Sequence, residues 1–204
     1  MKMHGWIYAV VMITAVACEV PPDNRKLLDE FVVSTNYDTE ADFRSYATFA
    51  IPTDTIGFAS NTSNDTIMIQ SEVDFPRPVL NAIRANMTAR GYERLDKTEN
   101  PDLGINVTLV NDYNLFQQVV YPSGYYSGYY GYSSYYSYPY VNTYAYNTGT
   151  LIVEIVDLKN KTPDNKVKVI WSSYMGDVYS SLDAVQQAED AIDQSFTQSP
   201  YVEN

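Results

Sequence analysis

The side chains that could carry out chemistry in this chain are mainly carboxylates and tyrosines. The sequence has one histidine, His4, and one cysteine, Cys18, and both lie near the N-terminus. His4 stands in an apolar leader that we expect to be removed, which would leave a mature chain without imidazole. Such a chain cannot form a Ser-His-Asp or Cys-His nucleophile or a histidine metal site. No phosphate loop, dinucleotide fingerprint or calcium loop is present either, so we expect no cofactor and no bound metal.

Carboxylates are the remaining groups that could act as acid and base, for example as two acids that flank a glycosidic bond. Four aspartates stand at the ends of expected strands: Asp102, Asp112, Asp157 and Asp177. The alternative is that they cap strands and keep the surface soluble, because sequence spacing does not fix the distance between two carboxylates. Two hypotheses follow, a non-enzymatic structural or binding protein and a glycan hydrolase. We expect the first, with no catalytic residue.

Residues 121–146 form a tyrosine-rich segment with twelve tyrosines in 26 positions, and no charged residue occurs from Tyr113 to Val153. A run with so few aliphatic side chains cannot pack a core of its own, which favours a solvent-reaching loop inserted between two strands. A tyrosine ring also offers a flat apolar face and a hydroxyl, which suits a surface that stacks on sugars. Polar and aromatic low complexity favours self-association instead. The candidate residues for glycan binding or self-association are Tyr125, Tyr126, Tyr129, Tyr130, Tyr135 and Tyr136.

Two short motifs, Asp54-Thr55-Ile56 and Asp65-Thr66-Ile67, are similar to the acceptor that some Gram-negative bacteria use for O-linked glycosylation. Thr55 and Thr66 are therefore candidate glycosylation sites. The alternative is turn chemistry, in which Asp and Thr side chains bond to the nearby backbone. Both motifs lie in or beside a Thr-, Asn- and Ser-rich stretch, residues 52–64, that we expect to be a loop.

The N-terminus indicates export. Lys2 precedes an apolar run from Trp6 to Ala17, which as a helix would be about 18 Å long and too short for a bilayer core of about 30 Å. Residues 1–17 therefore predict a signal peptide. Ala15-Val16-Ala17-Cys18 resembles a bacterial lipobox, in which Cys18 is acylated, although the small residues also suit ordinary signal cleavage. Residues 18–30 then form a lipidated cysteine and a tether, which leaves residues 31–204 for a single domain.

The charge balance restricts the partners. The formal net charge is −12, and removal of Lys2, the one charged residue of the signal peptide, makes it −13. Such a chain is not expected to bind nucleic acid, which is bound through neutralised phosphates. We expect it to reach a membrane through the acyl chains on Cys18. The expected location is the bacterial cell envelope, at the outer membrane, with the periplasmic or surface side left open. The expected partners are envelope glycan or envelope proteins.

Alternating apolar residues predict the strands of the domain. The expected strands are 31–33, 46–51, 105–109, 151–156 and 166–171, with 66–70 as a further strand or a loop. Strand 105–109 alternates with Asn106 and Thr108, so we expect one of its faces to be wet. Strand 151–156 is apolar on both faces, so we expect it to be central. Val153, Ile155 and Trp171 should be among the most buried side chains.

Two helices complete the pattern. The first has an apolar stripe at helical spacing: Val79, Leu80, Ile83 and Met87. Pro76 and Pro78 suit its first turn and Gly91 suits its C-terminal end. The second has another such stripe: Leu182, Val185, Ile192 and Phe196. Both stripes should be buried if the helices pack on one face of a largely antiparallel mixed sheet, which predicts an α+β fold with a tyrosine-rich insertion.

The order of several motifs resembles the bacterial lipoprotein family of domain of unknown function 4136. The matching stretches are residues 36–50, 79–95, 100–109, 149–157 and 168–178, followed by the last helix through Phe196 to Pro200. The resemblance implies an envelope lipoprotein with an α+β domain and an aromatic, glycine-rich insertion at the position of the tyrosines. It implies no catalytic residue.

Overall fold

The computed structural model describes residues 33–60, 67–111, 129–132, 134–137, 149–179 and 182–204. Its strands and helices belong to one unit, Phe31–Asn204. The strands are β1 (Val33–Tyr37), β2 (Thr48–Ala50), β3 (Thr55–Ala59), β4 (Ile67–Ile69), β5 (Glu93–Arg94), β6 (Leu103–Val110), β7 (Ser134–Ser137), β8 (Thr150–Asp157) and β9 (Lys166–Met175). The α-helices are α2 (Pro76–Ala89) and α5 (Ala184–Thr197), and two short 3₁₀ helices are η1 (Phe43–Ser45) and η2 (Lys97–Glu99).

The strands of the described residues form one mixed sheet in which the main strand order is β1-β9-β8-β6-β2-β5. The long ladders, β6 with β8, β8 with β9 and β1 with β9, are antiparallel. The shorter ladders of β2 with β5, β2 with β6, β3 with β6 and β7 with β9 are parallel. The predicted α+β class and the largely antiparallel mixed sheet are confirmed.

Strand β8 lies between β6 and β9, as its two apolar faces predict, and all of its residues are buried. The expectation of a wet face on β6 is wrong, because all eight residues of that strand are buried too. Asn106 and Thr108 point away from the helices and yet are almost fully covered, at 2% and 3% exposure. Something other than α2 and α5 therefore covers the second face of the sheet.

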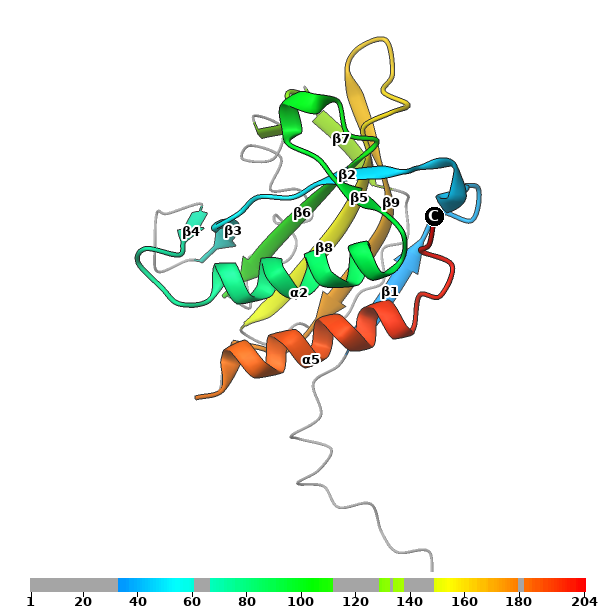
Figure 1. The fold of residues 1–204 in the computed structure, drawn as a ribbon. Helices are drawn as coiled ribbons and strands as arrows, with labels where there is room; N and C mark the ends of the chain where they lie inside the picture. Colours follow the sequence, from blue (N-terminus) through cyan, green and yellow to red (C-terminus); the bar gives the residue numbers. More distant parts are fainter. Residues whose placement is uncertain (1–32, 61–66, 112–128, 133, 138–148, 180–181) are drawn as a thin grey trace, which may run out of the picture. The chain divides into compact units, whose positions relative to one another are not determined.

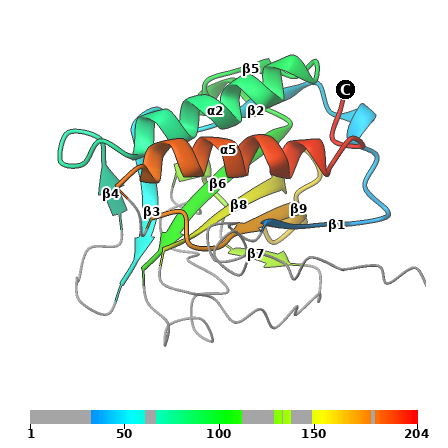
Figure 2. The same ribbon diagram turned by 90° about the horizontal axis from the view of Figure 1, so that it is seen from below.

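The two helices lie side by side across one face of the sheet (Figures 1 and 2). Pro76 and Pro78 stand in the first turn of α2, and Gly91 follows the helix with φ +93°, a conformation that glycine adopts without strain. The predicted stripe on α2 is fully buried: Val79, Leu80, Ile83 and Met87. Each such side chain contributes about 1.5–3 kcal/mol by its burial.

The stripe on the second helix is only partly as predicted. Ile192 and Phe196 are buried, and the Phe196 ring stacks on Trp171 at 5.3 Å between centroids. Leu182, in contrast, precedes α5 and is fully exposed, and Val185 is only half-buried. Leu182 is not a core residue, because α5 begins only at Ala184, and Val185 packs against the core but is only partly buried.

The expected loop at residues 52–64 contains a strand. β3 pairs with β6 in parallel and with β4 in antiparallel register. Ile56 and Phe58 alternate as in a strand, but the surrounding Thr, Asn and Ser residues favour a loop and outweighed this signal. Ile56 is fully buried in the main core, and Phe58 packs against it.

Candidate functional site

A gap in the sheet lies beside the middle of β6. Along one edge of this strand, β2 pairs with Leu103 and Gly104, and β3 pairs with the stretch from Thr108 to Val110. Among the described residues, no strand covers that edge between these two ladders. A buried backbone group without a hydrogen-bond partner is costly, so the gap needs another donor and acceptor.

Tyr130 supplies that donor and acceptor. Its hydroxyl accepts a hydrogen bond from the Ile105 N–H at 3.1 Å and lies 2.7 Å from the Ile105 carbonyl oxygen. The Ala50 carbonyl, at the end of β2, is 3.0 Å from the same hydroxyl. A hydroxyl carries one proton, so it donates to one of the two carbonyls at a time. The side chain thus takes the place of a missing strand, and Tyr130 is only 8% exposed.

Gly104 makes room for the Tyr130 ring. A Cβ at this position would meet Leu158 Cδ1 and Val156 Cγ2 at 3.0 Å and Tyr130 Cε2 at 3.2 Å. A glycine inside an apolar strand often marks a place where another group approaches the backbone closely. Gly104 in the middle of an apolar run was therefore the sequence signal for a covered second face.

A second, smaller core lies on this face of the sheet, away from α2 and α5. Its buried members are Ala50, Tyr130, Tyr132, Val156, Val167 and Val169, and Tyr129 and Leu158 pack against it. The rings of Tyr130 and Tyr132 are nearly parallel, at 6.4 Å between centroids. Two tyrosines of the tyrosine-rich segment therefore belong to a core.

Tyr132 lies beside a polar pair in the middle of the sheet. Asn106 Nδ2 donates to Glu154 Oε2 at 3.5 Å, and both side chains are buried. Burial raises the pKa of the Tyr132 hydroxyl above its ordinary value, the nearby Asn106 amide opposes this shift, and the Glu154 carboxylate adds to it. The phenol therefore stays neutral well into the alkaline range.

Three further interactions hold the described part of the tyrosine-rich segment on the domain. The Asn165 side chain donates from Nδ2 to the Gly131 carbonyl at 2.8 Å. The Lys97 ammonium lies 3.9 Å from the centre of the Tyr129 ring, within cation–π distance. The backbone of β7 pairs with β9 from Ser134↔Lys166 to Ser137↔Val169. Residues 129–132 and 134–137 are therefore attached to the sheet at several independent points.

These contacts correct the prediction for the tyrosines. The expectation of a loop throughout residues 121–146 is wrong for residues 129–130 and 134–137, which form a helical turn and strand β7. Tyr130 was expected to contact a glycan or another copy, but it is buried and anchors the segment instead. Tyr129 is half-buried and lies at the edge of this anchor. Tyr125 and Tyr126 lie outside the described residues, as do the side chains of Tyr135 and Tyr136.

The structure places two of the candidate acids at the same end of neighbouring strands, since Leu103 pairs with Asp157. Asp157 accepts hydrogen bonds from the Tyr46 hydroxyl and from the backbone and side-chain N–H groups of Asn160, all at 2.8 Å. Asp102 Oδ2 accepts from the backbone N–H groups of Ala47 and Thr48 at 2.7 and 3.2 Å. Each carboxylate is engaged in holding a loop to the sheet.

Asp177 is not part of this arrangement. Asp177 follows β9 in a turn with φ +64°, and Asp112 lies outside the described residues. The described residues contain no group of three or more His, Cys, Asp and Glu side chains that could hold a metal ion.

The modification candidates are only partly visible. Thr55 begins β3 and is half-buried, and its hydroxyl donates to Asp54 Oδ1 at 3.2 Å. Thr66, Cys18 and the expected signal peptide and tether lie outside the described residues. In the part of the chain that the structure does describe, neither helix has the length and apolar character needed to cross a bilayer.

These features define the class of the protein as an α+β domain with two helices on one face of a mixed sheet and a tyrosine anchor on the other. The chain belongs to the family described as "Domain of unknown function (DUF4136)", whose model matches residues 33–201. This confirms the family resemblance of the sequence motifs.

One solved structure of a family member agrees with this assignment. A crystal structure of a DUF4136 family protein from Bacteroides thetaiotaomicron VPI-5482 is similar, with 32% identity and a TM-score of 0.66, over 85% of this chain and 97% of that one. A PDZ domain protein from Parabacteroides distasonis ATCC 8503 matches at 17% identity and a TM-score of 0.46, over 84% of this chain and 36% of that one. No curated protein matches the chain.

Proposed function

We propose that this chain is a lipid-anchored protein of the bacterial cell envelope, at the outer membrane, that binds envelope glycan through its tyrosine-rich segment and catalyses no reaction. The observation that carries the proposal is the attachment of Tyr130 to the backbone of β6. A segment that served only as a spacer would not need a buried anchor. A segment that displays rings to a partner gains from one, because fixing the segment lowers the entropy lost on binding.

The division of the tyrosines supports this role. Tyr130 and Tyr132 are buried in the anchor, whereas the sequence on either side, residues 121–128 and 138–146, contains seven further tyrosines. Several rings on one segment, each stacking weakly, act together and bind a repeating polymer multivalently. The absence of charge in this stretch suits a neutral glycan.

The non-enzymatic part of the proposal is supported by the engagement of the candidate acids. Asp102 and Asp157 already accept hydrogen bonds from backbone and side-chain groups of the domain. A catalytic pair needs two carboxyl groups on either side of a substrate bond, with one able to give up a proton. Carboxylates that hold loops in place suit a structural role better.

The test of glycan binding separates the display tyrosines from the anchor. The variant changes seven tyrosines to serine and keeps residues 129–137: Tyr121, Tyr125, Tyr126, Tyr138, Tyr140, Tyr144 and Tyr146. Tyr37→Ser, on β1, is the control. We expect the protein and the control to be retained on purified cell-wall glycan and the variant to be washed off. Equal retention of all three would contradict the proposal. Loss of an oligomer with unchanged retention would indicate self-association instead.

The lipid anchor needs a separate test. Cells that express the protein are labelled with a palmitate analogue, and the protein is compared with Cys18→Ser. We expect label on the protein and none on the variant, because the sequence has no other cysteine. Fractionation of the envelope should then place the labelled protein with the outer membrane. Equal labelling of both proteins would contradict acylation at Cys18.

A further inference from the structure

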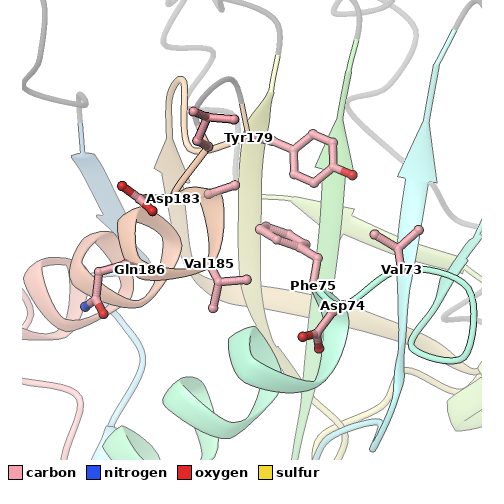
Figure 3. Close-up of a pocket in the computed structure, with 9 residues that line it drawn as sticks. Val73, Asp74, Phe75, Tyr179, Asp183, Val185 and Gln186 are labelled. Atoms are coloured by element: carbon pink, nitrogen blue, oxygen red, sulfur yellow. The ribbon is translucent and has the colours of Figure 1, made fainter.

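A pocket of about 400 Å³ lies where α2 and α5 begin, away from the residues of the tyrosine anchor. The two helices run in the same direction, so their N-terminal ends lie together (Figure 1). The chain before each helix and the turn after β9 form the walls, and Figure 3 shows Phe75, Tyr179 and Val185 grouped between Asp74 and Asp183. This volume lies in the range of small-molecule sites.

The floor and one wall are aromatic. Phe75 is buried, and Tyr179 is half-buried and meets it edge to face, at 4.9 Å between centroids and 77° between planes. This contact holds the Tyr179 ring in one orientation. Leu182 stands at the rim and is fully exposed, so it offers an apolar contact that no residue in the described part of the domain covers.

The polar side chains at the pocket mainly accept hydrogen bonds. Asp74 Oδ1 accepts from Gln70 Nε2 at 2.6 Å, which leaves Oδ2 for a ligand. Gln186 donates from Nε2 to Asp190 at 2.9 Å, which leaves its carbonyl oxygen Oε1. Asp183 adds a second carboxylate to the lining, and none of the described residues that line the pocket is basic. Such a site suits a ligand with several donors and disfavours an anion.

The helix ends decide between a neutral ligand and a cation. Asp74 lies just before the N-cap of α2, and Asp183 is the N-cap residue of α5, so the partial positive charge of each helix end offsets part of the carboxylate charge. The pocket is therefore less negative than two carboxylates alone would make it, which reduces the attraction for an ammonium group. A ring with hydroxyl donors, one apolar face and a methyl group meets all of these features.

We propose that this pocket binds one residue of an N-acetylated amino sugar. Its hydroxyls donate to Asp74, Asp183 and Gln186, its apolar face lies on Tyr179, and its acetyl methyl contacts Leu182. The inference rests on the proposed function in that it takes glycan as the ligand class, and it adds a second binding site on a different part of the domain.

The experiment follows the backbone amide signals of the purified protein by NMR while N-acetylglucosamine, or its linear trimer, is added. We expect saturable shifts at the pocket residues. Asp183→Asn and Tyr179→Ala should each weaken binding about tenfold, the effect of losing one good contact. Tyr179→Phe should retain binding because it keeps the ring, and Glu189→Gln, which removes a charge from the outer part of the same helix, should have no effect.

Two results would overturn the inference. One is the absence of amide shifts at the pocket residues when the trimer is added at a concentration high enough to saturate the pocket. The other is a shift with pentylamine but not with the sugars, which would make the pocket an ammonium site.

Retention on cell-wall glycan, measured with the serine variant of the tyrosine-rich segment, is independent of both of these NMR results. Loss of retention in that variant with no pocket shifts in the unchanged protein would reject this inference and leave the proposed function intact. Pocket shifts in the unchanged protein, together with unchanged retention of the serine variant, would support this inference and contradict the proposed function.

Discussion

The hydroxyl of Tyr130 bridges the backbone N–H and carbonyl groups of Ile105, at 3.1 and 2.7 Å, beside a stretch of β6 that no described strand covers. A side chain from a low-complexity segment thus completes the hydrogen bonding of a central strand. The relationship makes part of the tyrosine-rich segment a structural element of the domain.

Tyr130→Phe should lower the free energy of unfolding by about 1–3 kcal/mol. The substitution keeps the ring and leaves buried backbone groups of Ile105 and Ala50 without their partner. Urea unfolding followed by Trp171 fluorescence measures the change. Tyr37→Phe removes a hydroxyl from an exposed tyrosine and should change stability little. Equal unfolding midpoints for the two variants would contradict the role of the hydroxyl.

Gly104→Ala should destabilise the protein by about 1–3 kcal/mol, because the added methyl group is tightly packed against Leu158, Val156 and the Tyr130 ring. Leu158→Ala removes one of these neighbours, so the double variant should be more stable than the sum of the two single effects implies. Thermal or urea unfolding of the four proteins gives the coupling. Strict additivity would show that the methyl group does not meet Leu158.

Replacing residues 129–137 with a Gly-Ser linker of the same length should cost about 3–5 kcal/mol, similar to the loss of a large buried aromatic side chain. The change removes buried Tyr130 and Tyr132 and the pairing of β7 with β9. Differential scanning calorimetry measures it. A shift of only a few degrees in Tm would support the original expectation of a loop.

Ile155→Ala should cost about 2–5 kcal/mol, because Ile155 is fully buried in central strand β8. Leu182→Ala is the matched comparison. It removes a similar volume from a fully exposed side chain and should stay within about 0.5 kcal/mol of the unchanged protein. A cost at Leu182 as large as the cost expected at Ile155 would mean that Leu182 is covered in solution.

Alkaline pH should unfold the protein in step with its buried tyrosines. Burial is the main cause that raises the pKa values of Tyr46, Tyr92 and Tyr132 above their ordinary value. The folded state therefore favours the neutral phenols. Their contribution to stability is complete below the ordinary pKa of about 10 and is lost as the pH rises from there through the folded-state values.

Tyrosinate absorbance and Trp171 fluorescence should be recorded together during this titration. We expect the exposed tyrosines to ionise first and the buried ones to ionise together with the loss of the folded Trp171 signal. Tyr46→Phe removes one of the shifted groups, so its stability should fall less steeply with pH above the ordinary pKa. Ionisation of all tyrosines in one step, with the fold intact, would contradict the prediction.

The sequence by itself determined the helices and the central strand. The stripe from Val79 to Met87 recurs at helical spacing, and the two apolar faces of β8 require cover on both sides. Such patterns act within one element, and any fold that buries them must place them in a core. The order of the motifs was enough to predict the family, because each motif is also a pattern within one short stretch of sequence.

Only the tertiary structure decided what covers the second face of the sheet and what the polar residues do there. Tyr130 lies 25 residues from Ile105, and Asp157 lies 111 residues from Tyr46. No periodicity connects such partners, since a tyrosine in a low-complexity run has the same local pattern whether it is buried or exposed. The exposure of Leu182 was likewise decided by where α5 begins on the packed face. These assignments depend on which distant backbone groups are left without partners once the sheet has formed, and that is a property of the assembled fold.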